Sequence, residues 1–93
     1  MRAQAIPTVQ IENERVIVTE WRFAPGAETG WHTHGHDYVV VPMTHGTLLL
    51  ETDEGPITGA LVQGRSYTRK VGVKHNVVNA GVEELVFIEV ELR

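Results

Sequence analysis

Residues 30–42 read GWHTHGHDYVVVP and place three of the chain's five histidines at alternate positions, directly before three valines. Alternate residues of a β-strand point to the same side, so His32 and His34 should lie side by side on one face. Trp31 and the valine run indicate that this strand lies against a core. Clustered imidazoles repel one another there when protonated and need partners when neutral, and a bound cation resolves both problems. The stretch therefore predicts a β-strand that carries a metal site.

The rest of the chain has the turn spacing of an all-β protein. Glycine, proline and asparagine recur at short intervals, as at Pro25-Gly26 and Asn79-Ala80-Gly81, and leave no room for long helices. The segments between these turns are rich in Val, Ile, Thr and aromatic residues. About eight strands are predicted, at residues 8–11, 15–23, 38–43, 47–52, 57–61, 66–69, 75–79 and 85–92. Many short strands with this composition predict an antiparallel sandwich or barrel.

The last predicted strand, residues 85–92, has a fully apolar face and a second face that becomes acidic towards its end. The first face consists of Val86, Ile88, Val90 and Leu92, and the second of Leu85, Phe87, Glu89 and Glu91. Such alternation is typical of a half-buried strand. Elsewhere in the chain, the aromatic residues Trp21, Phe23 and Trp31 are expected to pack in the core.

Length and composition limit the class of protein. A chain of 93 residues forms one compact domain, which we expect to span residues 1–93. The net charge is −4, without a cluster of Lys and Arg, which argues against a nucleic-acid partner. No segment approaches the roughly 18 uncharged apolar residues of a membrane span, and the first residues lack the apolar run of a secretory signal. We therefore expect a cytoplasmic protein with no nucleic-acid or membrane partner.

A third metal ligand must come from elsewhere in the chain, because the histidine pair fills only two coordination positions. The candidate is His75, which follows a turn at Gly72 and lies in a predicted strand. Taken alone, His75 also fits a surface histidine of a strand. Neutral imidazole nitrogens suit divalent transition metals, so Fe, Mn, Ni, Cu and Zn all remain open for this site.

Two segments resemble the paired motifs of the cupin superfamily. GAETGWHTH, residues 26–34, is similar to the first cupin motif, G-x5-H-x-H, and Gly46 stands where that motif closes on a glycine. GRSYTRKVGVKHNVVN, residues 64–79, is similar to the second motif, G-x5-P-x-G-x2-H-x3-N, except that Lys70 replaces the proline. The chain is thus identified as a member of the cupins by two motifs in the correct order.

This resemblance implies a fold, a metal site and an assembly. The fold is an all-β, single-domain cupin jelly-roll barrel, also called a double-stranded β-helix. Its interior would hold a divalent transition metal bound by His32, His34 and His75, and two chains would form a homodimer. Residues 19–42, TEWRFAPGAETGWHTHGHDYVVVP, also resemble a subgroup of short bacterial cupins associated with the degradation of beta-alanine.

The chain departs from the first motif at its glutamate ligand. That glutamate normally follows the second histidine after three or four further residues, and Tyr38 and Val39 occupy these positions. Tyr38 either points inward, as a ligand, a hydrogen-bond partner of the substrate or a proton donor, or packs in the barrel with its hydroxyl at the rim. His36 or a water could also replace the glutamate, although we favour a place for His36 in the turn. Asp37 should point outward by strand alternation.

Other polar side chains are expected to have weaker roles. His45 and Glu28 should face solvent, and Asn79 should hold backbone groups or support a ligand. Tyr67 and Arg69 share a predicted strand face and could reach the mouth of the barrel. Arg69 could pair there with a carboxylate, but a solvated guanidinium is the favoured prediction.

The charge of the predicted site points to its substrate. Three neutral imidazoles leave a full dipositive charge on the metal, which favours an anionic ligand such as a carboxylate. We predict a metal-dependent enzyme for a small carboxylate or amino-acid-derived metabolite, with Tyr38 as the catalytic residue. Oxygenation by Fe(II) is the plainest chemistry, and isomerisation or decarboxylation would use the same site. The alternative is a non-catalytic cupin that binds or senses a small molecule, because the glutamate is missing.

Overall fold

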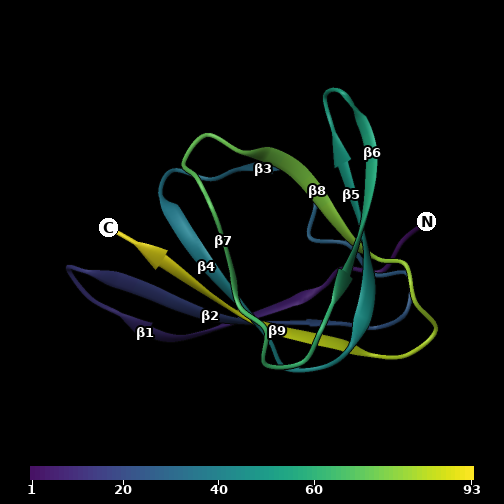
Figure 1. The fold of residues 1–93 in the computed structure, drawn as a ribbon, viewed down its shortest axis with the longest axis horizontal. Helices are drawn as coiled ribbons and strands as arrows, with labels where there is room; N and C mark the ends of the chain where they lie inside the picture. The colour runs from purple at the N-terminus through teal and green to yellow at the C-terminus, as the bar shows by residue number, and fades with distance from the viewer.

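The computed structural model describes all residues, 1–93, and consists of strands, turns and bends. Its strands (Figure 1) are β1 Ile6–Glu12, β2 Val16–Phe23, β3 His32–Thr33, β4 Asp37–Pro42, β5 Gly46–Thr52, β6 Gly55–Leu61, β7 Tyr67–Arg69, β8 Lys74–Asn79 and β9 Leu85–Leu92. All eight predicted segments are present as strands. The histidine strand is also present as β3, but it covers only two residues. No helix that could span a membrane is found.

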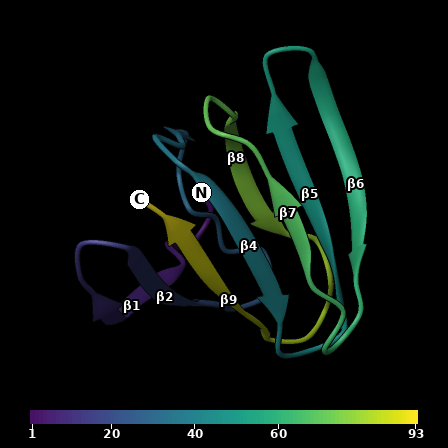
Figure 2. The same ribbon diagram turned by 60° about the vertical axis from the view of Figure 1, so that its left-hand side comes forward.

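The strands form two antiparallel sheets (Figure 2). The larger sheet has the order β1-β2-β9-β4-β7, and the smaller has the order β3-β8-β5-β6. The last strand, β9, lies between β2 and β4 and pairs with both along most of its length. This arrangement confirms the predicted all-β fold class. It also places β9, the C-terminal strand, at the centre of the larger sheet.

The hydrophobic core lies between the two sheets and changes into a polar interior along β9. Phe23 of β2 is fully buried beside its register partner Leu85, and its ring centroid lies 5.5 Å from that of Phe87. Further along the same face of β9 come Glu89 and Glu91. The core cluster contains Ala5, Phe23, Ala27, Tyr38, Val40, Leu48, Leu61, Val77, Leu85 and Phe87. The acidic end of β9 therefore faces the interior, whereas Ile88, Val90 and Leu92 of its apolar face are partly or fully exposed.

Of the three aromatic residues expected in the core, one is not there. Phe23 is buried and Trp21 packs against the core cluster, as predicted. Trp31 is 52% exposed, so its assignment to the core was wrong. It directly precedes His32, whose side chain points inward, and neighbouring residues of an extended chain point to opposite sides.

Gly46, the closing glycine of the first motif, opens β5 where the backbone passes close to β9. A Cβ atom at this position would lie 2.6 Å from Cδ1 of Leu85. Carbon atoms pack at about 3.5–4.0 Å, so any side chain here would displace the buried leucine. Glycine is therefore required by packing at this position.

Candidate metal centre

Strands β3 and β8 bring the three predicted histidines together. His32 is the register partner of His75, so their side chains share one face. His34 lies beyond the end of β3, but its N–H donates to the carbonyl of Val73 at 2.9 Å and its carbonyl accepts from the N–H of Gly72 at 2.8 Å. Gly72 has φ 93°, a conformation that favours glycine. The loop of the second motif thus holds the second histidine of the first motif in place.

The Nε2 atoms of the three histidines converge. Nε2 of His34 lies 3.0 Å from that of His32 and 3.1 Å from that of His75. The ring planes are tilted by 71° to 87° to one another, so ring edges rather than faces meet. His34 is 6% and His75 is 7% exposed. The three nitrogen atoms could hold one metal ion, and metal binding itself stays a prediction.

The protonation of this cluster suits a metal ligand set. Burial, together with neighbouring cationic groups, lowers the pKa of His34 and His75 to about 4, and these neighbours are His32 and His75 for His34 and His32 and Arg69 for His75. Both rings are therefore neutral at neutral pH. Nδ1 of His32 lies 2.8 Å from the carbonyl oxygen of Gly30 and must carry a proton to donate to it. Nε2 is then the ring nitrogen that faces the cluster, which is the arrangement that a metal ligand requires.

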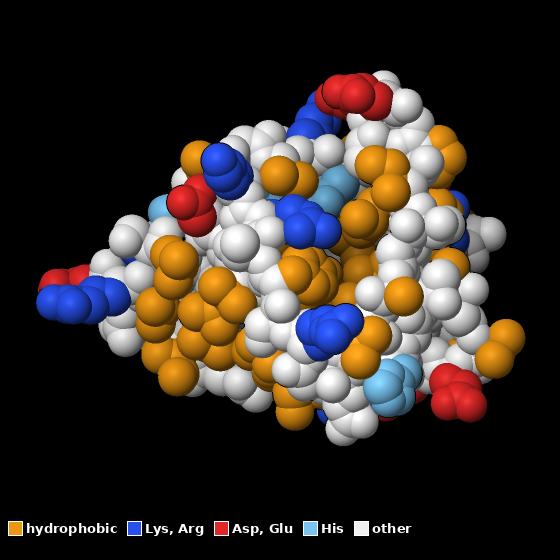
Figure 3. All heavy atoms as spheres, viewed as in Figure 1, with side chains coloured by type: hydrophobic (Ala, Val, Ile, Leu, Met, Phe, Trp, Pro, Cys, Tyr) orange, Lys and Arg blue, Asp and Glu red, His pale blue; other side chains and the backbone are white.

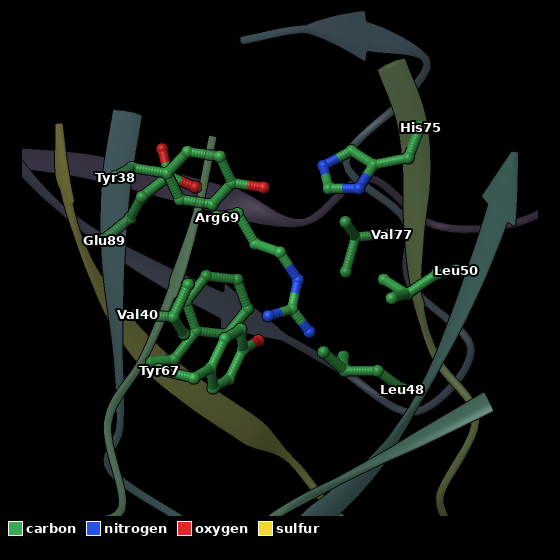
Figure 4. Close-up of a pocket in the computed structure, with 10 residues that line it drawn as sticks. Tyr38, Val40, Leu48, Leu50, Tyr67, Arg69, His75, Val77 and Glu89 are labelled. Atoms are coloured by element: carbon green, nitrogen blue, oxygen red, sulfur yellow. The ribbon is translucent and has the colours of Figure 1, made fainter. Parts of the chain in front are cut away.

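Tyr38, on β4, points into the protein. It is 2% exposed, and its ring stacks on His34 with a centroid distance of 3.8 Å and an interplanar angle of 21°. Burial and the nearby carboxylate of Glu89 raise the pKa of the Tyr38 phenol, so the hydroxyl stays protonated at neutral pH and can donate a hydrogen bond. Figure 4 shows the ring directed across the interior towards the strand that carries His75.

A cavity lies beside His75 between the two sheets (Figure 4). It leaves about 30 Å³ for the centres of water-sized groups, and one water needs about 10–15 Å³. The lining residues are Tyr38, Val40, Leu48, Leu50, Tyr67, Arg69, His75, Val77, Phe87 and Glu89. The cavity is therefore mostly apolar and takes a group of a few heavy atoms.

Arg69 carries a positive charge to this cavity. It is the register partner of Tyr38, and its guanidinium carbon lies 4.6 Å from the ring centroid of Tyr67. Its Nη1 donates to the carbonyl of Thr68 at 2.9 Å, and no carboxylate of the protein pairs with it. The side chain is exposed, as expected, yet it also lines the cavity. Arg69 can therefore receive an anion from solvent.

The inner face of β9 adds two carboxylates that the sequence reasoning did not assign to the site. One oxygen of Glu89, one of Glu91 and one ring nitrogen of His34 lie within 4.8 Å of one another. Glu89 is 8% exposed, and burial, with the neighbouring Glu91, raises its pKa to about 7. The sequence feature that could have indicated these two residues is the acidic end of one face of strand 85–92. Alternation alone does not say which face lies inside.

The residues next to the first motif lie outside the histidine cluster. His36 sits in the bend before β4, with its Nδ1 3.3 Å from Oε2 of Glu91. Asp37 is exposed and accepts a hydrogen bond from the N–H of Val71 at 2.8 Å. The expected place of His36 in the turn and the outward direction of Asp37 are thus correct. Neither side chain takes the position of the missing glutamate.

The remaining polar candidates have structural partners. His45 is exposed, as expected. Glu28 is half-buried and binds Arg2 and Asn76, so it is less open to solvent than expected. Asn79 is 1% exposed, and its Nδ2 donates to the carbonyl groups of Phe23, Ala24 and Glu83. The expectation that Asn79 holds backbone groups is confirmed.

Several known proteins are similar to this chain in sequence or in structure. No protein-family model matches it. The Beta-alanine degradation protein BauB of Pseudomonas aeruginosa is 66% identical over 92 residues, which are 99% of this chain and 97% of that protein. A cupin domain from Bordetella pertussis is 64% identical with a TM-score of 0.98, covering 100% of this chain and 97% of that one. A conserved protein with a double-stranded β-helix domain from Klebsiella pneumoniae is 27% identical with a TM-score of 0.80, covering 96% and 76%.

Proposed function

This chain belongs to the cupin superfamily, in the group of small bacterial cupins that includes the beta-alanine degradation protein, and we propose that it is a metal-dependent enzyme acting on a small carboxylate. The observation that carries the proposal is the convergence of three buried or half-buried Nε2 atoms within 3.1 Å of their neighbours. The lone pairs of neutral imidazoles that converge in this way repel one another unless a proton or a cation lies between them. A shared divalent cation is the partner that satisfies all three.

His32, His34 and His75 would hold the metal, which would supply Lewis-acid or oxygen-activating chemistry when bound. The ring of His32 is held by the Gly30 carbonyl, which accepts from its Nδ1, and the backbone of His34 is fixed by the loop before β8. Such support keeps the ligand nitrogen atoms in place without the metal. The metal identity is left to the experiment, since three nitrogen ligands select by geometry and availability.

The substrate class follows from the cavity beside His75. Its walls are mostly apolar, and Arg69 is its one cationic side chain. A guanidinium without a protein carboxylate binds a carboxylate through paired hydrogen bonds. A small carboxylate or amino-acid-derived molecule would place its anion at Arg69 and its remaining atoms near His75. The name of the Pseudomonas relative, which refers to the degradation of beta-alanine, supports this size and charge.

Tyr38 would be the catalytic residue. Its protonated phenol lines the same cavity as Arg69 and His75, so a bound substrate lies within its reach. The stacking on His34 fixes the ring, and the raised pKa of the phenol keeps its proton on the oxygen. Tyr38 would therefore orient the substrate by a hydrogen bond or pass a proton to it.

Elemental analysis of protein purified without added metal tests the proposal. We expect one divalent transition metal per chain, strongly reduced in a double variant with His32→Ala and His34→Ala. The exposed His45→Ala serves as the matched control and should retain the metal. Oxygen uptake with beta-alanine-related acids then tests the reaction, and Tyr38→Phe should slow it while the metal content stays unchanged. A metal-free protein that still binds such acids would instead favour the non-catalytic binding module.

We also propose that a second copy of the chain covers the outer face of the larger sheet. The central strands of this face carry the partly exposed side chains Val16, Val18, Val39, Val41, Ile88 and Val90. The solvated face of an antiparallel sheet is normally polar, and a large apolar patch marks an interface. Figure 3 shows hydrophobic atoms gathered where β1, β2, β4 and β9 lie.

Light scattering during size-exclusion chromatography tests the homodimer. The expected mass is twice the 10.4 kDa of one chain. Val90→Asp should shift the protein to the single-chain mass, because two buried charges would face each other across the interface. Ile57→Asp is the control, since Ile57 is exposed on β6 of the other sheet. A wild-type protein with the mass of one chain would contradict the proposal.

A further inference from the structure

We propose that the central strand β9 supplies the carboxylate missing from the first motif, with Glu89 as the fourth protein ligand of the metal. The inference rests on the proposed function, because it requires a metal at the histidine cluster. It concerns a residue outside both motifs. Glu89 lies in the last strand of the chain, far in sequence from the position where the first motif places its glutamate.

The register of the larger sheet brings β9 to the required place. Tyr38, which occupies the motif's glutamate position, faces Glu91 across the β4–β9 pair, and the inward residue after it, Val40, faces Glu89. Opposite side chains of an antiparallel pair have Cβ atoms about 5 Å apart. A carboxylate on this face of β9 therefore reaches the interior beside β4, where the stacked ring of Tyr38 leaves no acidic group.

Glu89 borders the histidine cluster from two sides. It lines the cavity that contains His75, and it also lines a second cavity that contains His32 and His34. One of its oxygen atoms lies within 4.8 Å of a ring nitrogen of His34. No other acidic side chain of the protein borders both cavities.

The charge around Glu89 calls for a cation. Glu89 is 8% exposed, and no Lys, Arg or His lies within ion-pair distance of it. Its nearest charged neighbour is another carboxylate, Glu91, which has His36 as its own partner. The charged form of a buried carboxylate beside a second one is unfavourable, so the group either takes up a proton or binds a cation. A divalent metal bound by three neutral imidazoles would provide that cation.

Glu91 would then be a positioning residue. Its contact with Nδ1 of His36 at 3.3 Å holds it at the outer side of the site, and one of its carboxylate oxygens lies within 4.8 Å of one of Glu89. Its removal should disturb the site less than the removal of Glu89. This ranking separates the two carboxylates experimentally.

Cobalt binding tests the proposal, with Co²⁺ as the probe. Glu89→Gln keeps the size of the side chain and removes its charge. We expect it to weaken Co²⁺ affinity, measured by competition with a chromophoric chelator, by about 10-fold or more, and to shift the visible absorption bands of the bound cobalt. Glu91→Gln should weaken affinity less and leave the bands in place. Glu54→Gln, in the exposed turn between β5 and β6, is the matched control and should behave as wild type.

Thermal unfolding gives an independent readout of opposite sign. Glu89→Gln should raise the melting temperature of the metal-free protein, because it removes a buried acidic group beside Glu91, and it should reduce the increase that saturating Co²⁺ produces. Unchanged cobalt bands in Glu89→Gln would overturn the inference even if affinity fell. They would mean that Glu89 does not bind the metal and only helps to position His34. A larger loss of affinity in Glu91→Gln would also overturn it. Wild-type protein that binds no Co²⁺ would overturn the proposed function as well, whereas equal binding by wild type and Glu89→Gln would overturn this inference alone.

Discussion

Acid should destabilise the metal-free protein through His34 and His75. Their pKa is about 4 in the folded chain, against an ordinary value of 6.5, so the unfolded chain binds more protons between these values. Their contribution to stability is therefore present above about pH 6.5 and is lost as the pH falls towards 4. A difference of one pKa unit corresponds to about 1.4 kcal/mol. The free energy of unfolding should thus fall by about 3 kcal/mol for each histidine between pH 7 and pH 4.

Glu89 should limit this loss. Its pKa is about 7 in the folded chain, against an ordinary value of 4.5, so the folded protein keeps this proton to higher pH than the unfolded chain. Its contribution is therefore present below about pH 4.5 and is lost as the pH rises through 7. Between pH 7 and pH 4, protonation of Glu89 therefore adds about 3 kcal/mol to the free energy of unfolding. We expect a net loss of about 3 kcal/mol in wild type and about 6 kcal/mol in Glu89→Gln.

Urea unfolding between pH 7 and pH 4, in the presence of a chelator and followed by tryptophan fluorescence, measures this loss. Ion pairs elsewhere, such as that of Arg2 with Glu51, titrate equally in both proteins, so the difference between the two curves isolates Glu89. The exposed variant Glu54→Gln should follow wild type. A wild-type stability that is flat or rises towards pH 4 would refute the histidine argument. Parallel curves for wild type and Glu89→Gln would refute the raised pKa of the buried Glu89 carboxyl.

Three further predictions concern packing and substrate binding. Gly46→Ala should lower the free energy of unfolding by about 1–3 kcal/mol, measured by urea unfolding, because its Cβ would meet Leu85; an unchanged value would mean that the strands separate freely. Asn79→Ala should cost about 2–4 kcal/mol in the same assay, because the backbone carbonyls that it satisfies would lose their donor; a cost below 0.5 kcal/mol would be that of a surface residue. Arg69→Met should weaken the binding of small carboxylates, measured by calorimetry, by about 10-fold or more, the loss of one charged hydrogen bond, and leave metal content unchanged; equal affinity would remove Arg69 from the site.

The strands and the two motifs could be read from the chain alone, because they depend on local spacing. Alternating apolar residues and frequent turn residues need no tertiary contact to be recognised. The spacing of His32 and His34 likewise places both side chains on one face. His75 was a candidate third ligand from its place in a predicted strand, and the resemblance to the cupins supported that assignment. The β3–β8 register then placed its ring against the other two.

The orientation of β9 could not be read in this way. Residues 85–92 have a fully apolar face, yet the inward face is the one that ends in Glu89 and Glu91. Period-two alternation separates the two faces without saying which one is buried. That choice depends on the partners β2 and β4, which lie far away in sequence.

Local patterns in the chain were enough to predict the all-β architecture, the three clustered histidines and the family, since each pattern depends on residues close together in the chain. The tertiary structure decided that Trp31 lies outside, that Tyr38 stacks on His34, and that a buried carboxylate comes from the last strand. The physical reason is that a side chain's surroundings are set by strand register between distant segments. The register depends on which whole sheet faces are buried, and single charged residues then lie wherever that register places them. A local sequence pattern does not contain this information.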